Sequence, residues 1–268
     1  MKIIDECDDD LKSYGFSSQA LEFGIVRSQL SVKSEKDEKK LGWRKGEYRL
    51  LTCPNLYLYN NKMWNFVKDA LVGIFKELMS GLCFCPKKVL VVGLGNEDVV
   101  ADSFGANVAK RVFASGHIEN KLVETKVYVF CPMVKSQSGI ETSELVGAVA
   151  KNIGAELIVL VDSLLTANLS RLAHSFQFSS AGLVPGGAVG GEGLIDQQTM
   201  GIATFSVGVP FMINLKDFCD SVKKDIIVAP KDIGLNIRKT SELVAKVINC
   251  VLFENLSEQE LSELSLTF

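Results

Sequence analysis

Two aspartates stand at places where the sequence predicts the ends of strands. Asp102 comes shortly after the apolar run 89–92 (VLVV), and Asp162 comes directly after the run 157–161 (LIVLV). In an open α/β sheet the ligand crevice lies beyond the carboxyl ends of the strands, so residues distant in sequence can meet there. Two carboxylates in one crevice repel each other, so one pKa rises and the pair shares a proton. Such a pair could activate water with one carboxylate and protonate a substrate carbonyl or leaving amine with the other.

Both aspartates also have a purely structural interpretation. Aspartate is a common N-cap, and each of the two could cap the helix that follows it. Ser163 follows Asp162 directly and could be a nucleophile, but no nearby base is indicated, so a cap or a bond to its neighbour is the alternative. Interacting acids titrate as a unit, so the sequence does not assign the acid and base roles within the pair.

The segment GLGN (93–96) resembles part of a dinucleotide-binding loop, but Asp98 stands where a third glycine is required. The alternative is a tight turn that glycine allows to bend sharply. In such a turn, Gly95 and Asn96 are candidates for supporting catalysis or binding a peptide. We therefore predict no nucleotide or other cofactor.

Other catalytic schemes lack their residues. The chain has no GxSxG and no HExxH motif, and only His117 and His174 could serve as a base or metal ligand, so no metal site is predicted. In the glycine-rich segment 181–193, Gly186 and Gly187 leave backbone N–H groups unshielded. These groups could line a peptide or stabilise an oxyanion, or the segment could be a surface loop without chemistry.

Glu141 is a further candidate, because it could orient a carboxylate or a substrate amine. Thr142 and Ser143 beside it are equally consistent with helix caps.

The elements that position these residues alternate along the chain. Apolar residues at three-and-four spacing predict an amphipathic helix over 63–82. Strand patterns and helix patterns then alternate, which is typical of βαβ units. Strands are predicted at 89–92, 123–130, 157–161, 174–179 and 203–209, and helices at 104–113, 144–153 and 237–252, with a short last helix opened by a capping box of Ser257 and Glu260. We predict a single α/β domain with a central, mainly parallel or mixed sheet flanked by helices.

Residues 1–50 differ from the rest, because they are polar and contain the charge run 33–40. We expect a loosely attached leader-like segment at 1–50, followed by the α/β domain at 51–268. The net charge of -3 gives no broad basic surface, so nucleic acid and anionic membranes are not expected partners. The acidic N-terminus and the lack of a long apolar stretch predict a cytoplasmic protein.

An ordered series of motifs resembles the germination protease family of spore-forming bacteria. The matching segments are 46–52 (GEYRLLT), 89–96 (VLVVGLGN), Asp102 in ADSFG, 138–146 (SGIETSELV), 157–164 (LIVLVDSL), 181–191 (AGLVPGGAVGG), 199–210 (TMGIATFSVGVP) and 229–233 (APKDI). The resemblance implies an atypical aspartic endopeptidase that degrades small acid-soluble spore proteins in the spore core. It also implies a fold of the hydrogenase-maturation peptidase type, usually assembled as a tetramer, with Asp102 and Asp162 as the catalytic pair.

Members of this family are made as zymogens that remove a short N-terminal propeptide by self-cleavage. Their substrates are cut beside glutamate with an aliphatic or aromatic neighbour. The segment 19–26 (QALEFGIV) is similar to such a site, so we expect processing at Leu21, Glu22 or Phe23.

The chain also departs from the family pattern. VADSFGA (100–106) stands where the family has TPDALGP, Val184 replaces a histidine, and Gly191 and Glu192 replace an asparagine and a basic residue. Two alternatives therefore stay open. One is a non-catalytic relative that binds spore proteins. The other is a hydrogenase-maturation endopeptidase, against which the GIET and PGGAVGG segments argue.

Overall fold

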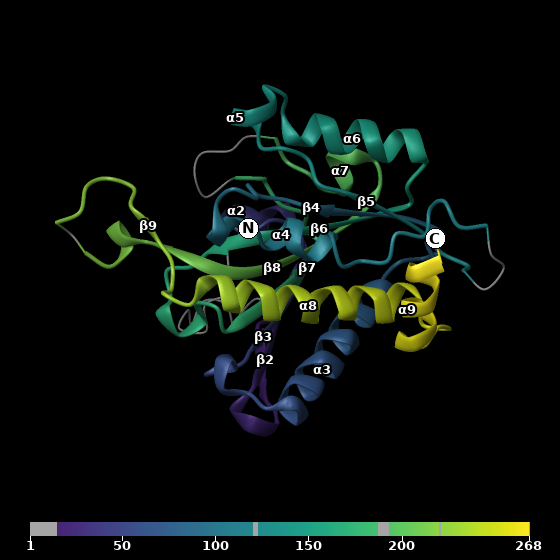
Figure 1. The fold of residues 1–268 in the computed structure, drawn as a ribbon. Coiled ribbons are helices and arrows are strands. Elements are labelled where there is room, and N and C mark those ends of the chain that lie inside the picture. Colours follow the sequence, from purple (N-terminus) through teal and green to yellow (C-terminus); the bar gives the residue numbers. More distant parts are fainter. Residues whose placement is uncertain (1–14, 120–122, 187–192, 220, 268) are drawn as a thin grey trace.

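The apolar runs of the sequence form the strands of one mixed sheet (Figure 1). The computed structural model describes residues 15–119, 123–186, 193–219 and 221–267. Within these ranges the strand order across the sheet is β1-β2-β3-β7-β8-β6-β4-β5, and β9 pairs with β8. The strands are β1 Ser17–Ala20, β2 Val26–Val32, β3 Gly46–Thr52, β4 Lys88–Gly93, β5 Lys126–Phe130, β6 Leu157–Leu165, β7 Ser175–Ser179, β8 Ala203–Asn214 and β9 Ile227–Val228.

The sheet has a parallel half and an antiparallel half. Strands β5, β4, β6 and β8 are parallel neighbours, whereas β1, β2, β3 and β7 pair antiparallel, as β7 does with β8. Both faces of β4 and β6 are buried, which explains why these strands are continuous apolar runs. The predicted mixed α/β fold is confirmed.

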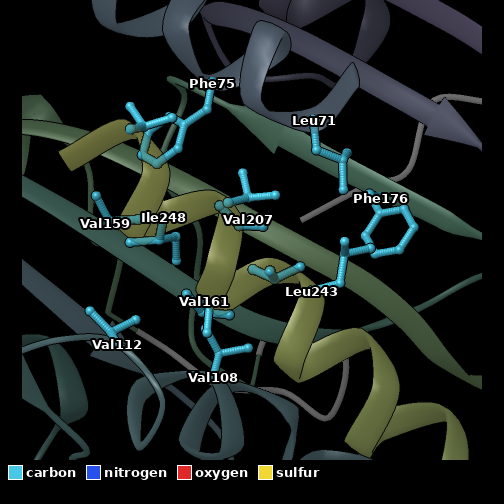
Figure 2. Close-up of a cluster of buried hydrophobic side chains, with 14 of the residues drawn as sticks. Leu71, Phe75, Val108, Val112, Val159, Val161, Phe176, Val207, Leu243 and Ile248 are labelled. Carbon is cyan, nitrogen blue, oxygen red and sulfur yellow. The ribbon is translucent and has the colours of Figure 1, made fainter. Parts of the chain in front are cut away.

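Helices cover both faces of the parallel half (Figure 1). On one face, Val159 and Val161 of β6 pack in a cluster with side chains from α3, α4 and α8 (Figure 2). On the other face, Leu160 packs with Val146 and Ala150 of α6. The helices are α2 Glu35–Leu41, α3 Asn61–Ser80, α4 Phe104–Ala109, α5 Lys135–Ser138, α6 Thr142–Ile153, α7 Gln197–Met200, α8 Ile233–Leu252 and α9 Glu258–Thr267, and the 3-10 turns are η1 Glu22–Gly24, η2 Leu56–Leu58, η3 Val100–Asp102, η4 Leu169–Arg171 and η6 Leu215–Asp217.

The long helices match the predictions within a few residues at most of their ends, because their apolar faces repeat at helical spacing. The capping box before α9 is confirmed: Ser257 N–H donates to Glu260 at 2.8 Å, and Glu260 N–H donates to Ser257 Oγ at 3.2 Å. Helix α4 is shorter than predicted and ends at Ala109. None of the helices in the described ranges combines the length and apolar composition that a bilayer-spanning helix requires.

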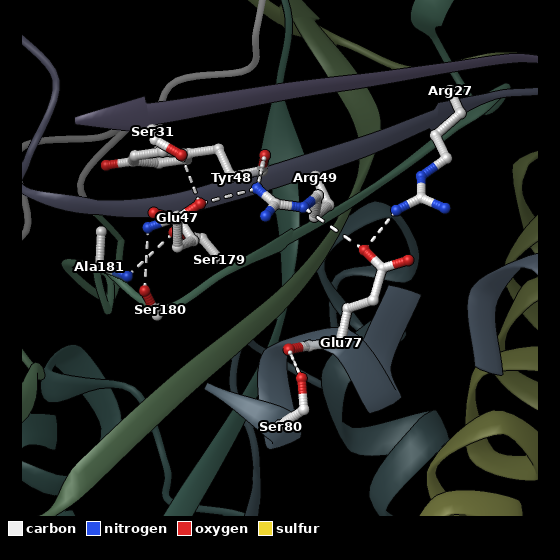
Figure 3. A network of polar contacts seen from close by, with 10 residues as sticks. All are labelled: Arg27, Ser31, Glu47, Tyr48, Arg49, Glu77, Ser80, Ser179, Ser180 and Ala181. Carbon is white, nitrogen blue, oxygen red and sulfur yellow. Dashed lines mark hydrogen bonds and ion pairs between the residues drawn. The ribbon is translucent and has the colours of Figure 1, made fainter. Parts of the chain in front are cut away.

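The expectation that residues 1–50 are loosely attached is wrong for the part of this segment that the structure describes. Strands β1, β2 and β3 extend the sheet, and β3 pairs with β7. Polar contacts fasten these strands to α3 (Figure 3): Glu77 of α3 forms ion pairs with Arg27 of β2 and Arg49 of β3. Short strands with polar residues on one face carry only a weak signal, so the sequence alone did not predict them.

Candidate active site

Asp162 lies inside β6, not after its end as the sequence suggested. The pairing of β4 with β6 stops at Gly93 and Val161, whereas β8 continues to pair with β6 through Asp162 and Gly208. Asp162 is therefore one residue beyond the last β4 partner. Beyond this last pair, the edge of β6 that was paired with β4 is next to the loop that follows β4. A residue from that loop or from the next element can therefore approach Asp162.

The Asp162 carboxyl is buried, and only 8% of the residue is exposed. Burial raises its pKa to about 7, the charge of Asp102 adds to this rise, and the Ser163 backbone N–H opposes it. Among the described residues, no lysine, arginine or histidine forms an ion pair with either aspartate. Like charges near each other without a cation favour sharing of one proton.

Asp102 ends η3 and is half-buried. Its Oδ2 accepts a hydrogen bond from the Asn96 backbone N–H at 2.7 Å. Burial raises the pKa of Asp102, and the hydrogen bond from Asn96 lowers it in part. Helix α4 has Ser103 as its N-cap and no side-chain cap, and Asp162 lies within a strand. The interpretation of the two aspartates as helix caps is therefore wrong.

Gly95 forms the tight turn that the sequence predicted, and Asp102 is the reason it must be glycine. Its φ is +104°, and a Cβ at this position would lie 2.0 Å from the Asp102 carbonyl oxygen. The Asp102 carboxyl carbon would be 3.1 Å from the same Cβ. Gly95 thus lets the loop fold closely over Asp102, and its neighbour Asn96 supplies the N–H that holds the carboxylate.

Two further glycines bring η3 to the end of β6. A Cβ on Gly105 would lie 2.3 Å from both the Leu94 and Val161 carbonyl oxygens, and one on Gly93 would lie 2.4 Å from the Gly105 oxygen. Helix α4 therefore packs backbone against backbone on β4 and β6, and η3 contacts β6, β8 and α8. This close packing is what brings Asp102 within electrostatic range of Asp162.

Ser163 lies within β6 and does not cap a helix, and its buried hydroxyl finds no hydrogen-bond partner in the part of the chain that the structure describes. Strand alternation places its side chain on the face of Val161, opposite to Asp162. Its backbone N–H is the part that bonds to the Asp162 carboxylate. Ser163 therefore supports Asp162 through its backbone.

Glu141 lies close to Gly193, the last residue of the glycine-rich segment. Glu141 is the N-cap residue of α6 but makes no side-chain cap bond, so Thr142 and Ser143 lie within the helix and do not cap it. Its carboxylate forms an ion pair with Lys135. A Cβ on Gly193 would lie 2.4 Å from the Ser143 hydroxyl and 3.6 Å from Glu141 Oε2. Glu141 therefore binds a lysine and borders the end of the glycine-rich segment.

An antiparallel bridge between Leu183 and Ile195 brings the two ends of the glycine-rich segment together. Gly186 has a φ of +62° in the turn after Leu183, and Gly187 lies outside the described residues.

Gln137 of α5 is the residue that sequence reasoning missed. Its Nε2 donates to Asn96 Oδ1 at 3.3 Å and to Asp98 Oδ2 at 3.1 Å. It therefore contacts the loop that holds Asp102. The short polar stretch around Gln137 has no helical or strand period, so no local signal indicated this contact.

The arrangement suits acid–base chemistry by carboxylates. Within the described ranges, no group of three or more histidine, cysteine, aspartate and glutamate side chains is placed to hold a metal ion. His174 stacks on Tyr57 with ring centroids 5.7 Å apart, and burial lowers its pKa. Asp162, whose pKa is raised to about 7, and Asp102, whose pKa burial also raises, are the candidate groups for proton transfer.

Comparisons with known proteins identify the family of this chain. A family model described as germination protease matches residues 5–221. The chain is 25% identical over 291 residues to a germination protease of Caldanaerobacter subterraneus subsp. tengcongensis, covering 91% of this chain and 89% of the relative. It is 24% identical over 298 residues to one of Clostridium perfringens (92% and 90% covered) and 28% identical over 221 residues to one of Clostridium tetani (78% and 68% covered).

Among solved structures, the chain is similar to the NiFe hydrogenase maturation protease HycI of Thermococcus kodakarensis. The TM-score is 0.37 and the sequence identity 17%, and the match covers 65% of this chain and 98% of that one. The family model covers well over half of the 268 residues. The chain therefore belongs to the germination protease family.

Proposed function

We propose that this protein is an endopeptidase that degrades small acid-soluble spore proteins during spore germination, with Asp102 and Asp162 as an acid–base pair. The proposal depends on one observation above all: Asp162 is buried next to Asp102 without a described cation, and its pKa is raised to about 7. Family membership supports the substrate class.

In the proposed reaction the pair holds one proton at the start. Asp162 has the strongly raised pKa, so it holds the proton, and ionised Asp102 accepts a proton from water as the water oxygen attacks the peptide carbonyl. Asp162 gives its proton to the carbonyl oxygen, forming a neutral tetrahedral diol. Collapse of the diol breaks the C–N bond, and the proton on Asp102 passes to the leaving amine while Asp162 recovers its proton from the diol hydroxyl.

The test compares Asp102→Asn and Asp162→Asn with a control aspartate. Asp69→Asn makes the same chemical change on α3, where the side chain is 75% exposed. Each full-length protein is incubated with a small acid-soluble spore protein at mildly acidic and neutral pH, and new termini are sequenced. We expect cleavage by the wild type and Asp69→Asn and none by the two other variants.

Wild-type cleavage by both Asp102→Asn and Asp162→Asn would refute the proposed pair. Binding of the spore protein by the wild type without cleavage would instead identify a non-catalytic relative. Circular dichroism and thermal unfolding of every variant separate loss of chemistry from loss of folding.

We also propose that the chain is made as a zymogen and cut near Leu21 to Phe23. This segment forms an exposed turn between β1 and β2, closed by a bond from Leu21 N–H to the Ile25 carbonyl at 2.7 Å. Phe23 has a left-handed φ of 59° and lies edge-on to Phe66, with ring centroids 5.4 Å apart. Left-handed backbone is strained for a bulky residue, which favours opening of this turn.

Intact-mass measurement tests this processing. We expect active wild-type protein to lose the residues before the cut and Asp162→Asn to keep them. An unchanged N-terminus in active protein would contradict the proposal.

A further inference from the structure

Gln137 connects the one-turn helix α5 to the loop after β4, whose Asn96 N–H binds the Asp102 carboxylate. Its single amide nitrogen bridges two acceptors, Asn96 Oδ1 at 3.3 Å and Asp98 Oδ2 at 3.1 Å. Asn96 Oδ1 also accepts the Asp98 backbone N–H at 3.0 Å. These bonds fix the turn whose Asn96 N–H donates to Asp102.

The segment around Gln137 is itself held in place. Lys135, two residues earlier, forms the ion pair with Glu141 at the start of α6. Gly139 closes α5 with a left-handed φ of +72°, and its N–H donates to the Lys135 carbonyl at 2.8 Å. Gln137 therefore projects from a segment tied to α6.

The charges around Asp102 show why an uncharged donor suits this position. The loop has two more acids: Glu97, which pairs with Lys110, and Asp98, which accepts from Gln137. Among the elements that contact η3, β8 and α4 have no charged residue, and β6 has only Asp162. On α8 the first charged residue is Arg238, after Asp232 at its N-cap. A donor amide satisfies Asp98 without bringing a cation to the aspartate pair.

We infer that Gln137 is a positioning residue for Asp102, acting through Asn96 and Asp98 to keep the Asn96 N–H directed at the Asp102 carboxylate. The inference deepens the proposed function and rests on it for its kinetic consequences. The hydrogen-bond geometry alone predicts its effect on the titration of Asp102. A hydrogen bond to the charged form favours that form, so a looser Asn96 N–H makes Asp102 harder to ionise.

The experiment compares Gln137→Ala, which removes the donor, with Gln137→Glu, which keeps the shape and adds a charge that repels Asp98. The same two changes at Gln198, exposed on α7, are the controls. The readouts on full-length protein are the pH dependence of kcat/KM for a spore-protein substrate, the separate kcat and KM values, and the carboxyl carbon NMR titration of Asp102, assigned with Asp102→Asn.

We expect Gln137→Ala to lower kcat about three- to tenfold with little change in KM, since positioning acts on the chemical step. The acidic limb of the profile and the Asp102 titration move to higher pH in Gln137→Ala and further in Gln137→Glu. The Gln198 variants keep wild-type values.

Three results decide the matter. An unmoved Asp102 titration in both Gln137 variants overturns the inference, as does a shift of equal size in the Gln198 controls. A lower melting temperature with an unchanged pH profile and titration also overturns it, because that pattern is one of structural support alone. If the wild type cleaves nothing, the proposed function fails while the NMR titration still reports on Gln137.

Discussion

Two groups of carboxylates in this molecule have opposite surroundings. Glu47 and Glu77 lie at the junction of the N-terminal strands and α3, where arginines neutralise them (Figure 3). Arg49 NH1 donates to Glu47 Oε2 at 3.0 Å, and Arg27 pairs with Glu77. Asp102 and Asp162 have backbone N–H donors and each other, and no ion pair with the described residues.

The presence or absence of a paired arginine distinguishes carboxylates that connect structural elements from carboxylates that are available for proton transfer. Glu77 of α3 holds β2 and β3 through Arg27 and Arg49, and Glu47 pairs with Arg49 within β3. The aspartates are partly removed from water, and no cation among the described residues pairs with them. Burial raises the pKa of both, that of Asp162 to about 7. Buried acids without a paired cation are candidates for a functional site, because their burial costs stability.

The largest effect is expected from neutralising an aspartate. Asp162→Asn should lower kcat/KM for a spore-protein substrate by at least about a thousandfold, whereas Glu77→Gln should leave it unchanged. Steady-state kinetics on both variants measures the contrast. Equal losses in the two variants would remove the distinction between joining and catalytic carboxylates.

The second-largest effect is expected from adding a methyl group where two backbones pack closely. Gly105→Ala places a methyl group 2.3 Å from the Leu94 and Val161 oxygens, so α4 must move and take η3 with it. We expect a loss of about 3 kcal/mol in the free energy of unfolding, and weaker catalysis. Gly73→Ala in α3 is the matched control, because nothing lies within 4 Å of its added Cβ, and it should be neutral or stabilising. Urea unfolding gives both values, and an unaffected Gly105→Ala protein would show that the close packing is not required.

The pH dependence of stability should sharpen the contrast further. Because folding raises the pKa of Asp162, the stabilisation from its bound proton is complete below the unfolded pKa of about 3.9. It is lost as the pH rises through the folded value of about 7. Asp162→Asn carries no charge, so it should match the wild type near pH 4 and exceed it by on the order of 4 kcal/mol at pH 8, since each unit of pKa shift is worth about 1.4 kcal/mol. Urea unfolding across this range checks the sign; a variant less stable at pH 8 than at pH 4 relative to wild type would contradict it.

The smallest effect is expected at the arginine-paired group. Glu77 is 45% exposed at its side chain, so Glu77→Gln should cost only about 0.5–1 kcal/mol of unfolding free energy. Added salt should shrink this difference, since screening weakens exposed pairs. A loss above about 2 kcal/mol would place this network among strongly coupled buried pairs instead.

Local pattern predicted much of this protein. The spacing of apolar residues predicted α3 and α8, continuous β-branched runs predicted β4 and β6, and the turn chemistry of Gly95 was read correctly. Each of these signals lies within about twenty residues, and each reflects burial that a single element requires.

Contacts between segments distant in sequence determined the features that local pattern did not predict. β3 is ordered because β7 pairs with it, and Asp162 stays in a strand because β8 extends beside β6 after β4 has ended. Gln137 meets Asn96 because α5 and the loop after β4 lie at the same edge of the sheet. The sequence alone determined which residues are capable of acid–base chemistry. Their charge state and partners were decided only in the folded chain, because burial and hydrogen bonding between distant segments set the pKa of a carboxylate.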